Sequence, residues 1–308
     1  MIVMRGRTEI KSLVIEGKGH QCAKGYTIVE LMVGLSISLL TGAVAMTFML
    51  SSSRMLANQS AEDVIQENAR FALEILASSV RLAGSNTSND LQTQSLSQGV
   101  FRGSICGTNG NEACNQQNTA YKAGVQNVNQ INATTDRLAV EYVTNTGRTC
   151  SGQPINFEQR VVHVFYVAEN NGISSLYCQA YLSTLDFATQ SFDTYNSAGN
   201  AVPLIEGVEM LQVQYGVDTD GTAEETIDRY VNFTTLSGNT AWFDRIKAIK
   251  IGLLLSNSSE SSANGIVNTE ISEARSYQLL DGSLTANDAI LRQAVSTTVF
   301  LPNSTSNI

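Results

Sequence analysis

Residues that could carry out catalysis are scarce in this chain. It contains two histidines in 308 residues, and only His163 lies beyond the first 25 residues. It has no H-E-x-x-H or G-x-S-x-G motif and no glycine-rich phosphate loop, so the common hydrolase and nucleotide-binding signatures are missing. A glycosidase needs only two carboxylates and leaves no such signature, but nothing in the sequence points to one. We therefore expect a protein that is not an enzyme.

Glu30 is the acidic residue with the most unusual surroundings. It is the one charged residue between Tyr26 and Leu50, a run that is otherwise mostly apolar and contains no proline. About 20 apolar helical residues span the hydrocarbon core of a bilayer, so this run predicts a membrane helix. A carboxylate inside such a helix costs roughly 2.5–3.5 kcal/mol on insertion scales and usually marks a functional position. Glu30 is therefore expected to have a cationic partner.

A cut after Gly25 would create such a cation, because Tyr26 would then carry a free α-amine. The amine and Glu30 would be separated by one helical turn, so they could neutralise each other within one chain. The start of a helix already carries partial positive charge, and in a bundle of identical helices the amine of one chain could equally meet Glu30 of the next. Both arrangements lower the cost of burying the carboxylate.

A second group of carboxylates follows a predicted strand at Asp218-Thr219-Asp220-Gly221. This pattern begins many calcium loops, and Glu224, Glu225 or Asp228 could add ligands. The full EF-hand spacing is absent, and an Asp-Gly turn between two strands explains the residues without a metal. We expect no cofactor, with calcium at Asp218 and Asp220 as the alternative.

Four cysteines lie beyond residue 25, namely Cys106, Cys114, Cys150 and Cys178. Four cysteines allow three disulfide patterns. We expect Cys106–Cys114, which are close in a polar stretch, and Cys150–Cys178, which flank a pair of predicted strands. Free thiols are the alternative. A zinc site is disfavoured because there is no C-x-x-C motif and His163 fits an ordinary strand residue.

A long helix must position Glu30. From Arg54 to Gly84 small and aliphatic residues recur every three or four positions, which predicts an amphipathic helix. They are Ala61, Val64, Ile65, Ala72, Ile75, Leu76 and Ala83. No proline interrupts Tyr26 to Ala83, so one continuous helix is expected, with its first half in lipid.

Three small residues, Gly34, Ser38 and Gly42, recur every four positions in the apolar half. Such a ridge lets membrane helices approach each other closely. Glycine and serine are also common in membrane helices in general, and the sequence leaves both readings open.

Strand patterns dominate after residue 137. We expect strands at Leu138–Tyr142, Val161–Val167, Leu176–Tyr181, Val208–Val217, Phe243–Leu255 and Val295–Leu301. Glu169-Asn170-Asn171-Gly172 indicates a hairpin turn between two of them. One long helix with several strands predicts an α+β fold, in which an antiparallel sheet with long loops packs on the helix.

Charge and the N-terminal pattern limit the alternatives. The net charge is −9, and without residues 1–25 it is −12, from 14 basic and 26 acidic residues. Such an acidic chain is not expected to bind nucleic acid. An ordinary secretory signal cut near Ala43-Val44-Ala45, or a plain signal anchor, would also explain the apolar run. Neither gives Glu30 a role.

The segment Lys24-Gly25-Tyr26-Thr27-Ile28-Val29-Glu30-Leu31 resembles the class III leader junction of type IV pilins and pseudopilins. The resemblance implies that a prepilin peptidase cuts after Gly25 and N-methylates Tyr26. It also implies that Glu30 is the assembly residue and that the chain has the type IV pilin fold.

Three further blocks are similar to the PilW family of minor pilins. They are Glu67 to Gly84, Leu204 to Gly221, and the closing strands around Trp242, Ile246–Leu255 and Ala294–Val299. The resemblance implies a leader at 1–25, a transmembrane half-helix at 26–53, an amphipathic half at 54–84 and a β-rich head at 85–308.

The PilW resemblance implies a minor pilin that primes pilus assembly and sits at or near the tip. Its expected partners are other minor pilins, the major pilin, the prepilin peptidase and the inner-membrane assembly machinery. The head would be periplasmic before assembly and at the cell surface afterwards. A membrane-anchored adhesin, or a J-like minor pseudopilin of type II secretion, is the alternative.

Overall fold

The computed structural model describes residues 25–85, 105–106, 135–156, 159–184, 196–221, 226–257, 274–288 and 290–303. The chain divides into two compact units, Met1–Leu56 and Ala57–Ile308. Residues 1–24, Cys114, Glu224 and Glu225 lie outside the described residues. The expectations that concern them therefore stay predictions.

The N-terminal helix, α1 (Ile28–Leu82), confirms the prediction of one helix without a break. Its last turn is closed by groups from elsewhere in the fold. Gly84 has a φ of 70°, and its N–H donates to the Glu141 carbonyl at 2.9 Å. The Asn303 amide donates to the carbonyls of Arg81 and Ala83 at 3.2 and 3.0 Å. The two Asn303 bonds satisfy some of the backbone carbonyls that have no partner within the last turn of a helix.

One side of α1 beyond residue 57 is buried against strands. The buried side chains follow the helical repeat and are Ala61, Ile65, Ala69, Ala72, Leu76, Ala77 and Val80. Four of these are alanines, so the helix backbone can lie close to the sheets. Full burial of Leu76 alone contributes roughly 1.5–3 kcal/mol.

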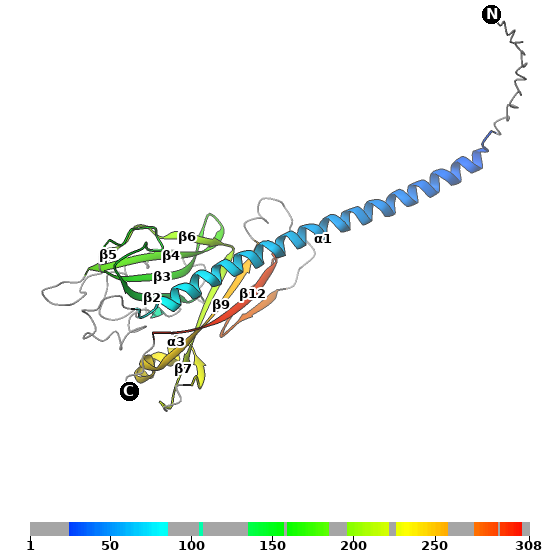
Figure 1. Ribbon diagram of the computed structural model, residues 1–308. Helices are drawn as coiled ribbons and strands as arrows, with labels where there is room; N and C mark the ends of the chain where they lie inside the picture. The colour runs from blue at the N-terminus through cyan, green and yellow to red at the C-terminus, as the bar shows by residue number, and fades with distance from the viewer. Residues whose placement is uncertain are drawn as a thin grey trace, which may run out of the picture. The chain divides into compact units, whose positions relative to one another are not determined.

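The strands form two main antiparallel sheets, and both contribute to the core under α1 (Figure 1). The first has the order β1-β2-β3-β4-β5, and β6 also pairs with β4. Its strands are β1 (Ile105–Cys106), β2 (Arg137–Thr144), β3 (Gln159–Asn170), β4 (Ile173–Thr184), β5 (Asn196–Ser197) and β6 (Val202–Glu206).

The second sheet has the order β12-β9-β7-β8, and a separate hairpin, β10-β11, packs on it. The strands are β7 (Val208–Val217), β8 (Arg229–Val231), β9 (Ile246–Ser256), β10 (Arg275–Leu279), β11 (Gly282–Ala286) and β12 (Arg292–Phe300). Two short helices, α3 (Phe233–Ser237) and η2 (Thr240–Arg245), connect β8 to β9.

The α+β class is confirmed, but two details of the prediction are wrong. We expected one sheet, and the described strands form two sheets and a hairpin. We also expected a strand to begin at Phe243, whereas this segment is the 3-10 turn η2 and β9 begins at Ile246. The predicted turn between β3 and β4 is confirmed, because Asn171 and Gly172 both have positive φ, at 53° and 80°.

Gly207 is the point where the chain leaves one sheet for the other. It lies between β6 and β7, with a φ of 84°. Its N–H donates to the Ser174 carbonyl of β4 at 2.8 Å, and its own carbonyl accepts from the Ser256 N–H of β9 at 2.7 Å. A Cβ at this position would overlap the Ser256 carbonyl oxygen. Only glycine fits both the backbone conformation and the space.

A partly buried ion-pair cluster fastens the β10-β11 hairpin to the second sheet. Arg292 on β12 bonds Glu209 on β7 at 2.6 Å and Asp288 at 2.8 Å, and its guanidinium lies 5.6 Å from the centre of the Tyr277 ring. The paired charges raise the pKa of Arg292 despite burial and lower that of Asp288. Apolar contact of Leu279 with Met210 and Leu254 completes the attachment.

Replacing Gly207 with alanine should lower the free energy of unfolding by roughly 2–4 kcal/mol, from left-handed strain and the clash with Ser256. Gly152→Ala is the matched control, because Gly152 has a φ of 83° but no atom within 4 Å of the added Cβ. Denaturant unfolding of the detergent-solubilised protein, followed by the fluorescence of Trp242, measures both. Equal losses in the two variants would contradict the role given to Gly207.

Candidate functional site

The candidate assembly site begins at Thr27, the residue before the first turn of α1. The Thr27 N–H and hydroxyl each donate to the Glu30 Oε2 atom at 3.3 Å. The Glu30 N–H donates back to the Thr27 Oγ1 atom at 3.2 Å. This reciprocal arrangement is a capping box, which satisfies two of the N–H groups that a helix start leaves open.

The capping box fixes where the Glu30 carboxylate lies. It is held at the first turn of α1, where the helix dipole favours negative charge. The Glu30 side chain is exposed, so another donor can still reach it. The predicted cleavage junction, Gly25 and Tyr26, immediately precedes Thr27. A cation formed at Tyr26 would therefore be close in the chain to a carboxylate that is already oriented.

Sequence reasoning singled out Glu30 but missed Thr27. The signal was present, because a Ser or Thr followed three residues later by Glu just before an apolar run is a recognised helix-start pattern. Thr27 thus belongs to the candidate site as a residue that positions Glu30.

Nothing within the described chain covers the apolar half of α1. Of the helices described, α1 is the one long and apolar enough to cross a membrane, and its most apolar 18-residue window is 0% buried. Large exposed side chains continue from Ile28 to Leu56. This surface needs lipid or other protein helices around it.

The predicted ridge of Gly34, Ser38 and Gly42 is open. No atom lies within 4 Å of a Cβ built at either glycine. The Ser38 hydroxyl donates to the Gly34 carbonyl at 2.8 Å, and the Thr41 hydroxyl donates to the Ile37 carbonyl at 3.0 Å. These hydroxyls are satisfied within the helix, so the ridge can enter lipid or meet another helix without unpaired donors.

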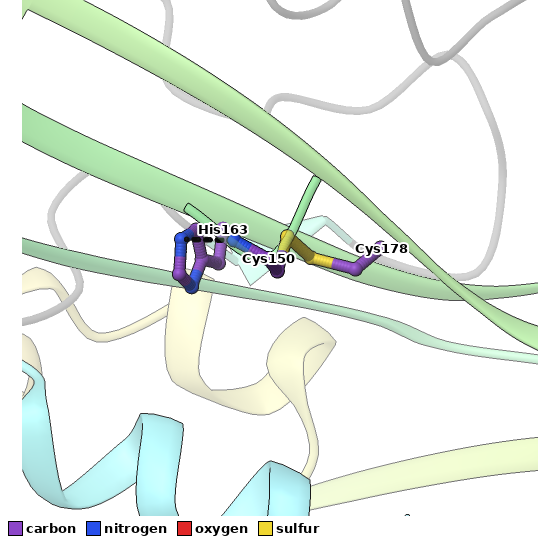
Figure 2. A group of neighbouring side chains, drawn as sticks. All are labelled: Cys150, His163 and Cys178. Carbon is purple, nitrogen blue, oxygen red and sulfur yellow. Dashed lines mark hydrogen bonds between the residues drawn. A yellow bond between two sulfur atoms is a disulfide. The ribbon is translucent and has the colours of Figure 1, made fainter. Parts of the chain in front are cut away.

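The predicted pair Cys150 and Cys178 forms a disulfide, which ties the turn after β2 to β4 (Figure 2). His163 on β3 lies beside it, and its Nε2 atom accepts the Cys150 N–H at 3.1 Å. Burial lowers the pKa of His163 to about 4, so the ring is neutral at ordinary pH. The two sulfurs are bonded to each other, so they offer no thiolate to a metal ion. The group of Cys150, His163 and Cys178 therefore has a structural role.

Cys106 lies on β1, and its predicted partner Cys114 is outside the described residues. The second disulfide therefore stays a prediction.

Two carboxylates organise the Asp218 turn. Asp228 Oδ2 accepts the Thr219 N–H at 2.7 Å, the Thr219 hydroxyl at 2.8 Å and the Asp220 N–H at 3.3 Å. Asp218 Oδ1 accepts the Gly221 N–H at 2.7 Å. These bonds, above all those from Thr219, lower the pKa of Asp228.

The same turn holds the residues of the alternative calcium site. Carboxylate oxygens of Asp218, Asp220 and Asp228 lie within 4.8 Å of one another. The turn is already held in its conformation by hydrogen bonds from backbone N–H groups to the carboxylates of Asp218 and Asp228. Calcium at Asp218 and Asp220 stays the untested alternative to a turn without a metal.

Thr135 and Asp136 join the two main sheets, which sequence reasoning did not foresee. The Asp136 N–H donates to the Leu211 carbonyl of β7 at 2.7 Å, and the Leu211 N–H donates to Thr135 Oγ1 at 3.0 Å. Asp136 Oδ2 accepts the Val213 N–H at 2.9 Å. Burial raises the pKa of Asp136 to about 7, with a further contribution from the nearby Asp281 carboxylate.

Part of the chain matches a known protein family. Residues 164–303 match the family of the type IV pilus-assembly protein W, PilW. The matched segment runs from the middle of β3 to the end of the described chain, so it covers the whole second sheet and the first sheet from the middle of β3 to β6. No curated protein and no solved structure matches the chain.

The fold should lose stability as the pH rises, through Asp136. Its pKa in the folded state is about 7 against 3.8 unfolded. The folded state therefore binds the Asp136 proton more tightly than the unfolded state does. The stability that this proton contributes is fully present below pH 3.8 and is lost as the pH rises through 7. At 1.36 kcal/mol per pKa unit the loss is up to about 4 kcal/mol.

Asp136→Asn keeps an acceptor for Val213 but cannot ionise, so it should become more stable relative to the unchanged protein between pH 4.5 and 8. The comparison is needed because His163, with its pKa lowered to about 4, contributes an opposite slope below pH 6.5 in both proteins. Trp242 fluorescence during denaturant unfolding measures the difference. A difference that does not change with pH would show that Asp136 ionises normally.

Proposed function

Because residues 164–303 match the PilW family of type IV pilus-assembly proteins, we propose that the chain is a minor pilin. It primes assembly of a type IV pilus and enters the filament at or near its tip. A prepilin peptidase first removes residues 1–25 by cutting after Gly25. The observation that carries the proposal is the capping box of Thr27 and Glu30, which lies next to that junction.

Cleavage changes the charge around this site. The new α-amine of Tyr26 is a cation at the helix start, one turn from the carboxylate that Thr27 orients. A carboxylate in lipid costs roughly 2.5–3.5 kcal/mol, and an opposite charge at contact distance offsets much of that cost. In a growing filament the amine of a neighbouring subunit can take the same place. This ion pair then determines where along the filament axis each new subunit docks.

The rest of the helix supplies the packing. The open row of Gly34, Ser38 and Gly42 lets a neighbouring helix approach closely, and van der Waals contact replaces contact with lipid. We propose other minor pilins and the major pilin as these neighbours. The inner-membrane assembly machinery would extract the subunit, whose head is periplasmic before assembly and at the cell surface afterwards.

The features of the head domain fit a periplasmic location before assembly, and they do not point to a catalytic reaction. Its disulfide, Cys150–Cys178, is of the kind that persists in oxidising compartments such as the periplasm. His163 is buried beside the disulfide, so it is poorly placed to act on a substrate. We propose neither a catalytic role nor a cofactor.

Glu30→Ala should abolish surface pili while the level of the processed protein stays normal, because the carboxylate is needed for docking. Glu62→Ala is the control, since Glu62 is an exposed acidic residue of the same helix. Electron microscopy of cells and immunoblotting of the membrane fraction measure the two quantities.

Other outcomes of this experiment would point to other functions. Normal piliation with lost attachment would identify an adhesin instead, and normal piliation with lost protein secretion would identify a pseudopilin.

A further inference from the structure

Arg137 is a buried arginine with no anion beside it among the described residues. It is the first residue of β2 and is only 5% exposed. Its Nε atom is buried and has no hydrogen-bond partner. By contrast, Arg160 pairs with Glu141 at 3.2 Å, and Arg292 pairs with Glu209 at 2.6 Å. A buried charge is unfavourable unless another group compensates it, so Arg137 calls for a partner of opposite charge.

The Arg137 side chain lies on the face of the first sheet that is turned away from α1. Successive residues of a strand point to opposite faces. Leu138 belongs to the core under α1, so Arg137 points the other way. We name this face the outer face. It carries an apolar cluster of its own, which consists of Ala139, Val162, Val164, Tyr166, Ala168 and Tyr181.

A tyrosine hydroxyl next to Arg137 also lacks a partner. Leu138 pairs with Phe165 across β2 and β3, so Arg137 and Tyr166 are neighbours on the outer face. Tyr166 is 0% exposed, and its hydroxyl oxygen has no hydrogen-bond partner. Its ring stacks on the ring of Tyr177 on β4, with the centres 5.8 Å apart. Since buried tyrosine hydroxyls usually have a partner, two neighbouring side chains here lack an acceptor.

The two groups offer a positive charge and several donors. A guanidinium stays protonated in proteins and cannot accept a hydrogen bond, although burial lowers the pKa of Arg137. Burial raises the pKa of Tyr166, and that of the nearby Tyr181, to about 12. Both phenols therefore keep their protons at neutral pH. A guanidinium next to a phenol O–H is a donor set that suits an anion.

The surroundings favour a carboxylate over a phosphate. The planar fork of an arginine matches both groups, but a phosphate group carries a charge of about −1.5 to −2 at pH 7. Among the described residues of the outer face the other cation is Arg160, which is already paired with Glu141. A carboxylate carries one charge, which Arg137 alone balances. The apolar cluster and the stacked rings of Tyr166 and Tyr177 suit a planar or apolar body.

We propose that the outer face binds the carboxylate of a small organic acid, with the Arg137 guanidinium and the Tyr166 hydroxyl as its donors. Tyr177 is half-buried, whereas Arg137 and Tyr166 are buried, so the body of the acid extends towards Tyr177. A free acid and the C-terminus of a peptide both carry this group. The site is in the head unit and does not involve Glu30, so it does not rest on the proposed function.

Titration calorimetry of the full-length, detergent-solubilised protein at pH 7 tests the site, with benzoate as the probe. Benzamide has nearly the same shape without the charge, and inorganic phosphate is a different anion. Benzoate should bind at least about tenfold more tightly than either. No binding of benzoate, or equal affinities for benzoate and benzamide, would overturn the proposal.

A short peptide distinguishes the two sources of the carboxylate. The probe is a tripeptide that ends in phenylalanine, and its C-terminal amide is the uncharged control. Tighter binding of the tripeptide than of benzoate would identify a peptide end as the natural ligand, and the reverse order would identify a free acid. Both results require that the amide binds at least about tenfold more weakly than the tripeptide.

Substitutions test the two donors. Arg137→Gln and Tyr166→Phe should each weaken benzoate binding at least about fivefold. Arg148→Gln is the matched control, because Arg148 is exposed and loses the same charge, and it should change the affinity less than about twofold. Unchanged benzoate affinity in either outer-face variant would contradict the site.

Stability without benzoate separates a ligand site from an ion pair within the chain. A buried charge that has no partner does not stabilise the fold, so Arg137→Gln should not lower the denaturant midpoint, measured by Trp242 fluorescence. A lower midpoint would show that the chain itself supplies the anion, which would overturn the proposal. Tyr166→Phe removes a hydroxyl without a partner and keeps the ring, so the binding test does not depend on Arg137→Gln alone.

Discussion

The apolar half of α1 cannot remain in water, and the rest of the structure depends on this constraint. From Tyr26 to Leu56, 17 large apolar side chains are exposed. At roughly 1.5–3 kcal/mol for each buried side chain, leaving them in water forgoes on the order of 25–50 kcal/mol. A folded domain is stable by only about 5–15 kcal/mol. Lipid must cover this helix first, and other helices must cover it if the chain leaves the membrane.

If the apolar half of α1 moves between lipid and other helices, the head must fold without that half. The head unit meets this need through its own core, which buries one side of α1 beyond residue 57 under both main sheets. Gly207 and the Thr135–Asp136 segment fasten those sheets to each other, and the disulfide and the Arg292 cluster fasten the outer turns. The parts of the chain that could face partners, namely the capping box and the apolar half of α1, are outside this core.

Sequence patterns predicted the features that depend on local rules. The absence of proline and the helical repeat predicted α1, alternation predicted the main strands, and Asn171-Gly172 predicted a hairpin turn. The division into two sheets was not predictable in this way, because it depends on which distant strands pair. Gly207 looks like any loop glycine until Ser174 and Ser256 are placed on either side of it. Asp136 becomes unusual only when β7 and Asp281 surround it.

We propose that processing after Gly25 creates the cation that Glu30 meets. Intact-mass and peptide mass spectrometry of the chain purified from assembled pili tests this most directly. We expect a chain that begins at N-methyl-Tyr26. A chain that begins near Met46, or one that keeps residues 1–25 in functional pili, would contradict it.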